Sequence, residues 1–144
     1  MEKIAYEKDF YAWLMHNAEL LRQGRSSEID VEHIAEELES MGKSERRELI
    51  SRLSVLMSHF LKWLFQPELR SNSWKYTIEE QRRAVTDLLE DSPSLRYELK
   101  DRLAKAYTTA LLQAARETEM DKARFPEQCP FSLDQILDED FWPN

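Results

Sequence analysis

Apolar residues recur at intervals of three and four along most of the chain, and no segment sustains the alternation of a half-buried strand. This spacing gathers apolar side chains on one side of a helix, so the pattern predicts an all-α protein. From Leu49 to Trp63 the apolar positions follow a four, three, four, three rhythm, which is typical of a seam between packed helices.

Start and stop signals divide this pattern into segments. Gly24 and Gly42, the two glycines, stand where periodic segments end, and Pro67 ends another. Candidate helix starts are Asp30, Ser44, Ser71 or Ser73, Ser92 before Pro93, and Ser132 with Gln135 in a capping-box pattern. The expected helices cover about 9–23, 30–42, 44–66, 71–91, 92 to at least 114, and 132–137.

These segments predict a compact single-domain helical bundle over residues 1–144. It has four main helices, a short acidic helix at 30–42, a core bundle over about 8–118, and a docked C-terminal tail over about 119–144. Phe131, Phe141 and Trp142 are expected to hold the tail on the bundle. A chain of 144 residues with 42% hydrophobic residues can bury a core without metals or disulfides.

Composition and charge narrow the setting. Cys129 is the one cysteine, so no internal disulfide can form, and the acidic start lacks the features of a signal peptide. We therefore expect a cytoplasmic location. The longest apolar run, around residues 55–65, is too short to cross a bilayer and contains His59 and Lys62, so no membrane segment is expected.

The net charge of −8 is unevenly distributed. Residues 1–42 carry four basic and ten acidic side chains, residues 43–83 nine and five, and residues 84–144 seven and thirteen. The middle third is therefore a basic region between two acidic ones, and the acidic thirds disfavour nucleic-acid binding. The tail is acidic and could fold back on this basic region through Asp134, Asp138, Glu139 and Asp140.

A polar strip beside the seam of the third expected helix is the first candidate site. Together with one residue of the next helix it comprises Arg52, His59, Lys62, Gln66 and Gln81. A hairpin closed near residues 69–70 would bring His59 opposite Gln81, which stands between Ile78 and Val85 on an apolar stripe. Because a buried amide needs a partner, we favour a register-setting His59–Gln81 contact over catalysis.

The turn between these helices is the second candidate. A phosphate or carboxylate could be held by the free N–H groups at the helix start together with Arg70, Ser71, Ser73, Trp74 and Lys75. The competing interpretation is that these residues are only helix caps and solvated charges, as at any helix start, and it is favoured.

No metal, cofactor or catalytic residue is predicted. The chain contains no Glu-x-x-His unit of a dimetal bundle, and a His33–Glu37 clamp is better explained as a surface charge pair. Glu36, Glu37 and Glu39 resemble half of the magnesium motif of all-α nucleotide pyrophosphatases, but the second half is missing. A Gly-rich phosphate loop is also absent.

Long blocks of the chain resemble one family, and they include YEKDFYAWL, HIAEELESMGKSERRELISRL, HFLKWLFQPELRSNSW, EDSPSLR and FSLDQILDEDFWP. The family is the uncharacterised, mainly cyanobacterial domain of unknown function 29. The resemblance covers nearly the whole chain and implies an all-α bacterial protein, with no activity or site residue to carry over.

Two functional hypotheses follow. The preferred one is a small interaction or regulatory module without catalytic activity that binds another protein through the basic face of residues 43–83; a homodimer is compatible with it. The alternative is a small hydrolase or transferase for a phosphorylated metabolite at the 52–74 hairpin face. In that hypothesis His59 is the acid or base, and Arg52, Lys62 and Arg70 bind the anion.

Overall fold

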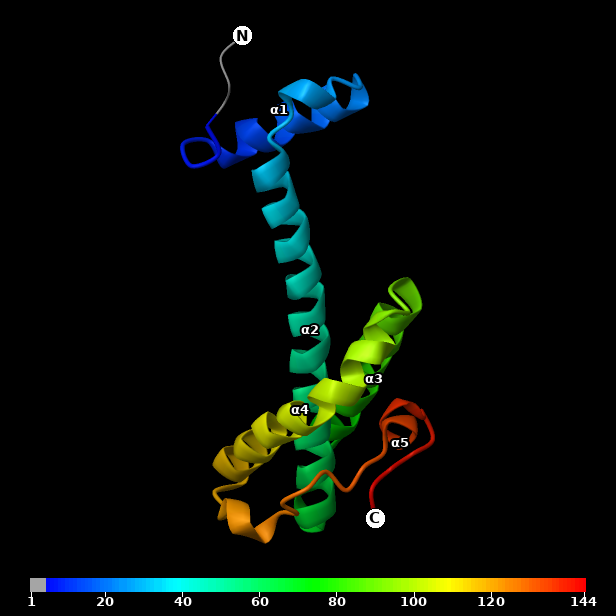
Figure 1. Cartoon of the computed structure of the whole chain (residues 1–144). Helices are drawn as coiled ribbons and strands as arrows, with labels where there is room; N and C mark the ends of the chain where they lie inside the picture. Colours follow the sequence, from blue (N-terminus) through cyan, green and yellow to red (C-terminus); the bar gives the residue numbers. More distant parts are fainter. Residues whose placement is uncertain (1–4) are drawn as a thin grey trace. The chain divides into compact units, whose positions relative to one another are not determined.

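Local capping explains where most of the helices begin. A computed structural model describes residues 5–144 and contains no strand within them (Figure 1). Asp9 accepts a hydrogen bond from the N–H of Ala12 at 3.0 Å, and Ser71 accepts one from Trp74 at 3.2 Å. The helices are α1 Phe10–Arg22, α2 Val31–Phe65, α3 Asn72–Asp91, α4 Leu95–Thr118 and α5 Leu133–Leu137. Short 3-10 turns lie at Ser26–Glu28, Pro67–Leu69 and Lys122–Arg124.

The all-α prediction is confirmed, and so are the four long helices. The chain divides into two compact units with a boundary between Ser44 and Glu45. We call them the N-terminal unit and the C-terminal unit. The assignment of residues 1–144 to a single domain stays a prediction.

The predicted break near residue 42 is wrong. Gly42 lies inside α2, and the supposed short acidic helix at 30–42 is the first part of that helix. Gly24, in contrast, adopts a φ of +69° just beyond α1, as expected of a helix-ending glycine. One interior glycine costs a helix only about 1 kcal/mol, and the surrounding Leu, Met, Glu, Lys and Arg residues favour helix strongly.

A seam signal in the sequence also crosses Gly42. Ala35, Gly42, Leu49, Leu56 and Trp63 are each seven residues apart, so the apolar stripe keeps its register through the glycine. A cap at Ser44 would have interrupted that register.

The core of the C-terminal unit forms where the second half of α2 packs with α3 and α4. The predicted seam residues Leu49, Leu53, Leu56 and Phe60 are fully buried, whereas Trp63 is half-buried at its edge. Buried positions on the other two long helices are Ile78, Val85, Leu89, Leu99, Ala106, Tyr107, Ala110 and Ala114. The small alanines allow α4 to approach its neighbours closely.

α4 begins two residues later than Pro93, the predicted first helical position. Leu95 and Arg96 donate to the carbonyls of Ser92 and Pro93, so tighter turns with three-residue spacing precede the regular helix. The helix ends at Thr118, and the residue that follows it, Glu119, has a left-handed φ of +58°.

The C-terminal tail is docked, as predicted. Ser132 and Gln135 form the capping box of α5. Phe131 and Phe141 meet Phe60 edge-on, with ring centroids 5.2 and 5.7 Å apart, and Trp142 lies 4.8 Å from Trp63. In Figure 1 the tail returns to α3, with which α5 is in contact.

The two glycines provide a matched test of the continuous α2. A Cβ added at either position would meet no atom within 4 Å, so only the backbone conformation differs. Gly42→Ala is expected to raise the free energy of unfolding by about 0.5–1 kcal/mol, because alanine favours the helix interior. Gly24→Ala is expected to lower it by about 1–2 kcal/mol, because alanine disfavours a positive φ. Urea unfolding followed by circular dichroism measures both, and a loss of stability in Gly42→Ala would contradict an unbroken α2.

Candidate functional site

Arg52 and Gln81 are the two members of the predicted polar cluster that meet. The Arg52 Nη1 donates to Gln81 Oε1 at 3.3 Å across α2 and α3. Its Nε also donates to Glu48 Oε1 at 3.1 Å, one turn earlier on α2. The amide of Gln81 therefore has a partner across the hairpin, but the partner is an arginine.

The predicted hydrogen bond between His59 and Gln81 is wrong. The His59 Nδ1 lies 2.9 Å from the carbonyl oxygen of Val55 in the preceding turn of α2 and donates to it. Burial lowers the pKa of His59, and the charge of Lys62 lowers it further against the opposing effect of the Val55 hydrogen bond. His59 is thus a half-buried ring that is hydrogen-bonded to its own helix, in surroundings that favour the uncharged form.

Lys62 and Gln66 connect α2 to the end of α4. The Lys62 ammonium donates to Glu117 Oε2 at 2.6 Å and lies 5.3 Å from the ring centre of Trp74. The hydrogen bond from Lys62 lowers the pKa of Glu117. Gln66 Nε2 contacts the sulfur of Met120 at 3.0 Å. Each of the five cluster residues therefore makes a contact within the protein. Ligand binding by these residues stays a prediction.

The predicted anion-binding turn is also largely engaged internally. Arg70 donates to the carbonyl of Trp63 at 2.8 Å and lies over the Trp63 ring at 4.8 Å, while Ser71 caps α3. Ser73 and Lys75 remain exposed. Lys75 borders a cavity of about 490 Å³ that is also lined by Trp63, Glu79, Glu139 and Trp142. Two carboxylates in that lining would repel an anion.

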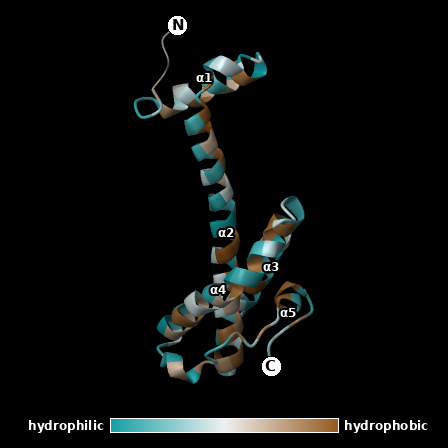
Figure 2. Cartoon of the chain, viewed as in Figure 1, coloured by the Kyte–Doolittle hydropathy of each residue, from teal (hydrophilic) through white to brown (hydrophobic). Residues whose placement is uncertain are grey.

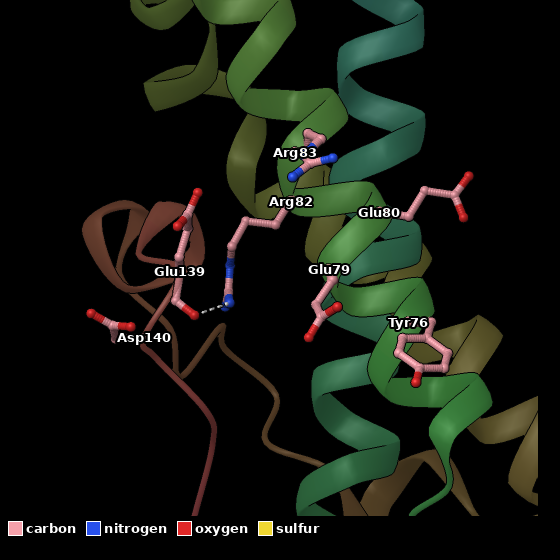
Figure 3. A pocket seen from close by; sticks show the side chains of 7 residues that line it. All are labelled: Tyr76, Glu79, Glu80, Arg82, Arg83, Glu139 and Asp140. Atoms are coloured by element: carbon pink, nitrogen blue, oxygen red, sulfur yellow. Dashed lines mark hydrogen bonds between the residues drawn. The ribbon is translucent and has the colours of Figure 1, made fainter.

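Arg82 is a key residue that the sequence analysis missed (Figure 3). Its side chain is only 3% exposed. The guanidinium donates to the carbonyl oxygens of Ile136, Glu139 and Phe141 at 2.9, 3.3 and 2.9 Å, and lies 5.2 Å from the Phe60 ring. Burial lowers the pKa of Arg82, against the opposing charges of Asp138 and Glu139.

A spacing signal could have found this arginine. Ile78, Arg82, Val85 and Leu89 are separated by four, three and four residues, so Arg82 belongs to the buried stripe of α3. The sequence analysis had placed its neighbour Gln81 on that stripe, and Gln81 is only half-buried. Beside Arg82 is a cavity of about 590 Å³, lined by Tyr76, Glu79, Glu80, Arg82, Arg83, Glu139 and Asp140.

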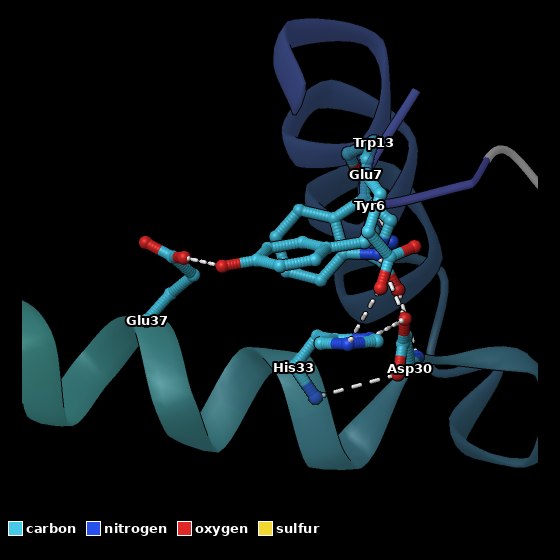
Figure 4. Close-up of polar contacts among 7 residues, drawn as sticks. Tyr6, Glu7, Trp13, Asp30, His33 and Glu37 are labelled. Carbon is cyan, nitrogen blue, oxygen red and sulfur yellow. Dashed lines mark hydrogen bonds and ion pairs between the residues drawn. The ribbon is translucent and has the colours of Figure 1, made fainter. Parts of the chain in front are cut away.

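A second polar network organises the N-terminal unit around Asp30 (Figure 4). Its carboxylate accepts from the Trp13 indole N–H at 2.9 Å and from His33 Nδ1 at 2.8 Å. The Asp30 N–H donates to Asn17 Oδ1 at 2.8 Å. One side chain therefore joins α1 to the start of α2. The hydrogen bonds that the carboxylate accepts from His33 and Trp13 lower the pKa of Asp30, and the one from the His33 side chain has the largest effect.

Tyr6 covers the other side of His33. The two rings are stacked with centroids 4.1 Å apart, and the Tyr6 hydroxyl donates to the Glu37 carboxylate, which raises the pKa of Tyr6 to about 12. The hydrogen bond with Asp30 raises the pKa of His33, whose Nε2 lies 3.6 Å from Glu7. Glu37 thus accepts a hydrogen bond from Tyr6, and the predicted charge pair between Glu37 and His33 is not formed. Within residues 5–144, no group of three or more His, Cys, Asp or Glu side chains is arranged to hold a metal ion.

Comparison with models of protein families found a match. The model of "Domain of unknown function DUF29" matches residues 5–142, which is nearly the whole chain. The chain belongs to the DUF29 family. Comparison with curated proteins found no match. No solved structure matched either.

The family assignment carries no activity, so the function of this DUF29 protein has to be argued from its own residues. Across residues 5–144, none of its helices combines the length and apolar character that a bilayer span requires.

Replacing Arg82 tests how the tail is held in this DUF29 protein. Arg82→Lys keeps the charge but cannot reproduce a planar fork on three carbonyls, so we expect a loss of about 2–3 kcal/mol in the free energy of unfolding. Amides of residues 131–142 should lose protection in hydrogen exchange. Arg83→Lys, an exposed neighbour, is the control and should change neither measurement. Equal effects of the two substitutions would contradict the role of Arg82.

The Asp30–His33 pair predicts a pH window for the N-terminal unit. His33 has a raised pKa, so its contribution to stability is full below its ordinary value of 6.5 and is lost as pH rises through the raised pKa. Asp30 has a lowered pKa, so its contribution is full above 3.8 and is lost as pH falls through the lowered pKa. The unit should be most stable between pH 3.8 and 6.5.

Thermal melts of the Trp13 indole N–H signal in NMR spectra, repeated across pH, measure this window. His33→Gln should abolish the loss of stability above pH 6.5, and His16→Gln on α1 should retain it. An unchanged pH profile in His33→Gln would contradict the assignment.

Proposed function

We propose that this DUF29 protein is a cytoplasmic, non-catalytic interaction module that binds a partner protein through its N-terminal unit. The observation that carries the proposal is the distribution of exposed apolar side chains. Twelve large hydrophobic residues are exposed among those described, and eight belong to the N-terminal unit, the shorter of the two. They are Phe10, Tyr11, Leu14, Met15, Leu21, Val31, Leu38 and Met41.

The exposed residues of α2 form an ordered stripe. Val31 and Leu38 are seven residues apart, which is the spacing of a helix-packing seam. Ile34, which is half-buried, and Met41, which is exposed, have the same separation. Leu38 and Met41 are 64% and 65% exposed. Figure 2 shows hydrophobic positions recurring along this part of α2. Contiguous exposed apolar surface of this kind is typical of an interaction site.

The charge of the N-terminal unit indicates the chemistry of the partner. Glu32, Glu36 and Glu39 are exposed on the same stretch of α2, on a different face from the stripe. Residues 1–42 carry ten acidic against four basic side chains. A partner helix with an apolar face and basic flanks would complement both features, as in helix-in-groove recognition. A second copy of the same acidic surface would be repelled, so we favour a different protein over a homodimer.

The preferred sequence hypothesis placed the partner on the basic face of residues 43–83. Five of the nine basic residues there are engaged by contacts within the protein: Arg46, Arg52, Lys62, Arg70 and Arg82. Exposed apolar surface supports the N-terminal unit as the docking site instead. No observation favours the hydrolase alternative, since His59 is bound to a backbone carbonyl and has a lowered pKa.

Two designed peptides test the proposal directly. Both are amphipathic helices of about three heptads with leucine at the seam positions, one with lysine and the other with glutamate elsewhere. Fluorescence anisotropy should show that the full chain binds the lysine peptide and not the glutamate peptide. The double substitution Leu38→Ser with Met41→Ser should weaken that binding about tenfold or more, because each change removes apolar area that the bound peptide would cover.

Leu112→Ser provides the matched control, since Leu112 is an exposed leucine on α4 in the C-terminal unit. It should leave peptide binding unchanged. Equal binding of both peptides, or equal effects of all the substitutions, would overturn the proposal. A concentration-dependent dimer in size-exclusion chromatography that the Leu38/Met41 variant abolishes would assign the surface to a second copy instead.

A further inference from the structure

The C-terminal unit contains a basic cavity between α2 and α4 that plays no part in the proposed docking. Its volume is about 380 Å³, within the range of about 300 to 1,000 Å³ typical of small-molecule sites. Four cationic side chains line it: Arg46, Arg47, Arg102 and Lys105. No carboxylate is part of the lining.

Helical spacing brings these cations together. Arg46, Arg47 and Ser51 lie within about one turn and a half of α2. Arg102, Lys105 and Thr109 occupy one side of α4, because they are separated by three and four residues. At the base of the cavity the buried Ser54 hydroxyl contacts the carbonyls of Ile50 and Ala106 at 2.9 and 3.2 Å. Two packed helices therefore position the cationic groups.

Carboxylates of the protein pair with only some of the four cations that line this cavity. Among the described residues, Glu98 is the one carboxylate that forms ion pairs with the cations of the lining, at 3.9 Å from Arg46 Nη1 and 3.3 Å from Arg102 Nε. In the part of the chain from residue 5 onward, Arg47 and Lys105 form no ion pair. Gathering like charges is unfavourable, and a bound anion would relieve that repulsion.

We propose that this cavity binds a small phosphorylated ligand of the pyrophosphate type, carrying at least two negative charges. Guanidinium groups match phosphate oxygens with paired hydrogen bonds, and Lys105 adds a compact charge. The hydroxyls of Ser51 and Thr109 and the amide of Gln113 supply neutral donors, while Ile50 offers an apolar wall to the rest of the ligand. Side chains would hold the phosphates here, because the chain has no Gly-rich loop.

The size and surroundings of the cavity favour a small molecule over a nucleic acid. A nucleic-acid backbone would extend well beyond 380 Å³ and meet a chain of net charge −8. A single phosphate would contact only some of the four cations, whereas the longer pyrophosphate could contact more of them. The affinity of the cavity should therefore increase from phosphate to pyrophosphate.

Calorimetric titration of the full chain with inorganic pyrophosphate at low salt is the test. We expect one bound pyrophosphate per chain, and about tenfold or greater weakening in each of Arg102→Gln and Lys105→Gln. Arg96→Gln and Lys100→Gln are the matched controls, since both residues are exposed on α4 and do not line the cavity. They should change the dissociation constant less than twofold, and all four variants should retain the wild-type circular dichroism spectrum.

NMR amide shifts locate the bound anion independently of the variants. Pyrophosphate should perturb residues 46–54 and 102–113 most. Equal weakening in the control variants, shifts centred on residues 70–75, or no binding would each overturn the proposal. A single-stranded oligonucleotide that binds more tightly than pyrophosphate and depends on the same two residues would assign the site to nucleic acid and overturn the small-molecule assignment.

Discussion

The C-terminal unit depends on one buried cation that completes the hydrogen bonding of the chain end. α5 is only five residues long, so most of its carbonyls cannot find partners within the helix. Arg82 supplies donors to three carbonyls in and after α5, and its guanidinium also lies over Phe60 in the core. The acidic tail does return to the basic third of the chain, but main-chain carbonyls rather than the tail carboxylates make the contacts. Such contacts are shielded from salt because they are buried.

The N-terminal unit is organised differently, because polar contacts replace a large apolar core. Among its described residues, Trp13 and Leu20 are the buried hydrophobic side chains, and Asn17 is buried beside them. Asp30 joins these residues to α2 by accepting hydrogen bonds from an indole and an imidazole. Most of the apolar side chains of this unit are consequently left on its surface. A unit stabilised by a carboxylate and an imidazole is sensitive to pH, and a unit with an uncovered seam is suited to binding a helix.

The two proposed sites rest on separate evidence and call for different ligands. The N-terminal surface combines apolar side chains with glutamates, which suits a basic helix. The cavity between α2 and α4 combines four cations with hydroxyls, which suits phosphate groups. Neither site uses His59. His59 is half-buried and hydrogen-bonded to its own helix, and burial lowers its pKa, so this histidine in an apolar run is part of the packing.

The sequence by itself determined the helical class, the cap at Ser132 and the docking of the aromatic tail, because these follow from periodicity and from contacts a few residues apart. It left the cap of α3 open between Ser71 and Ser73, and the structure shows Ser71. At Gly42 the glycine predicted a break, whereas the seven-residue register that crosses it indicates the continuous helix of the structure. Tertiary structure also decided the polar pairings. Gln81 and Arg82 are adjacent in sequence, and the rotation of α3 about its own axis determines which of the two side chains is buried. Their partners lie tens of residues away, at Arg52 and in the tail, and only the packing of α2, α3 and the chain end brings these groups within hydrogen-bonding distance.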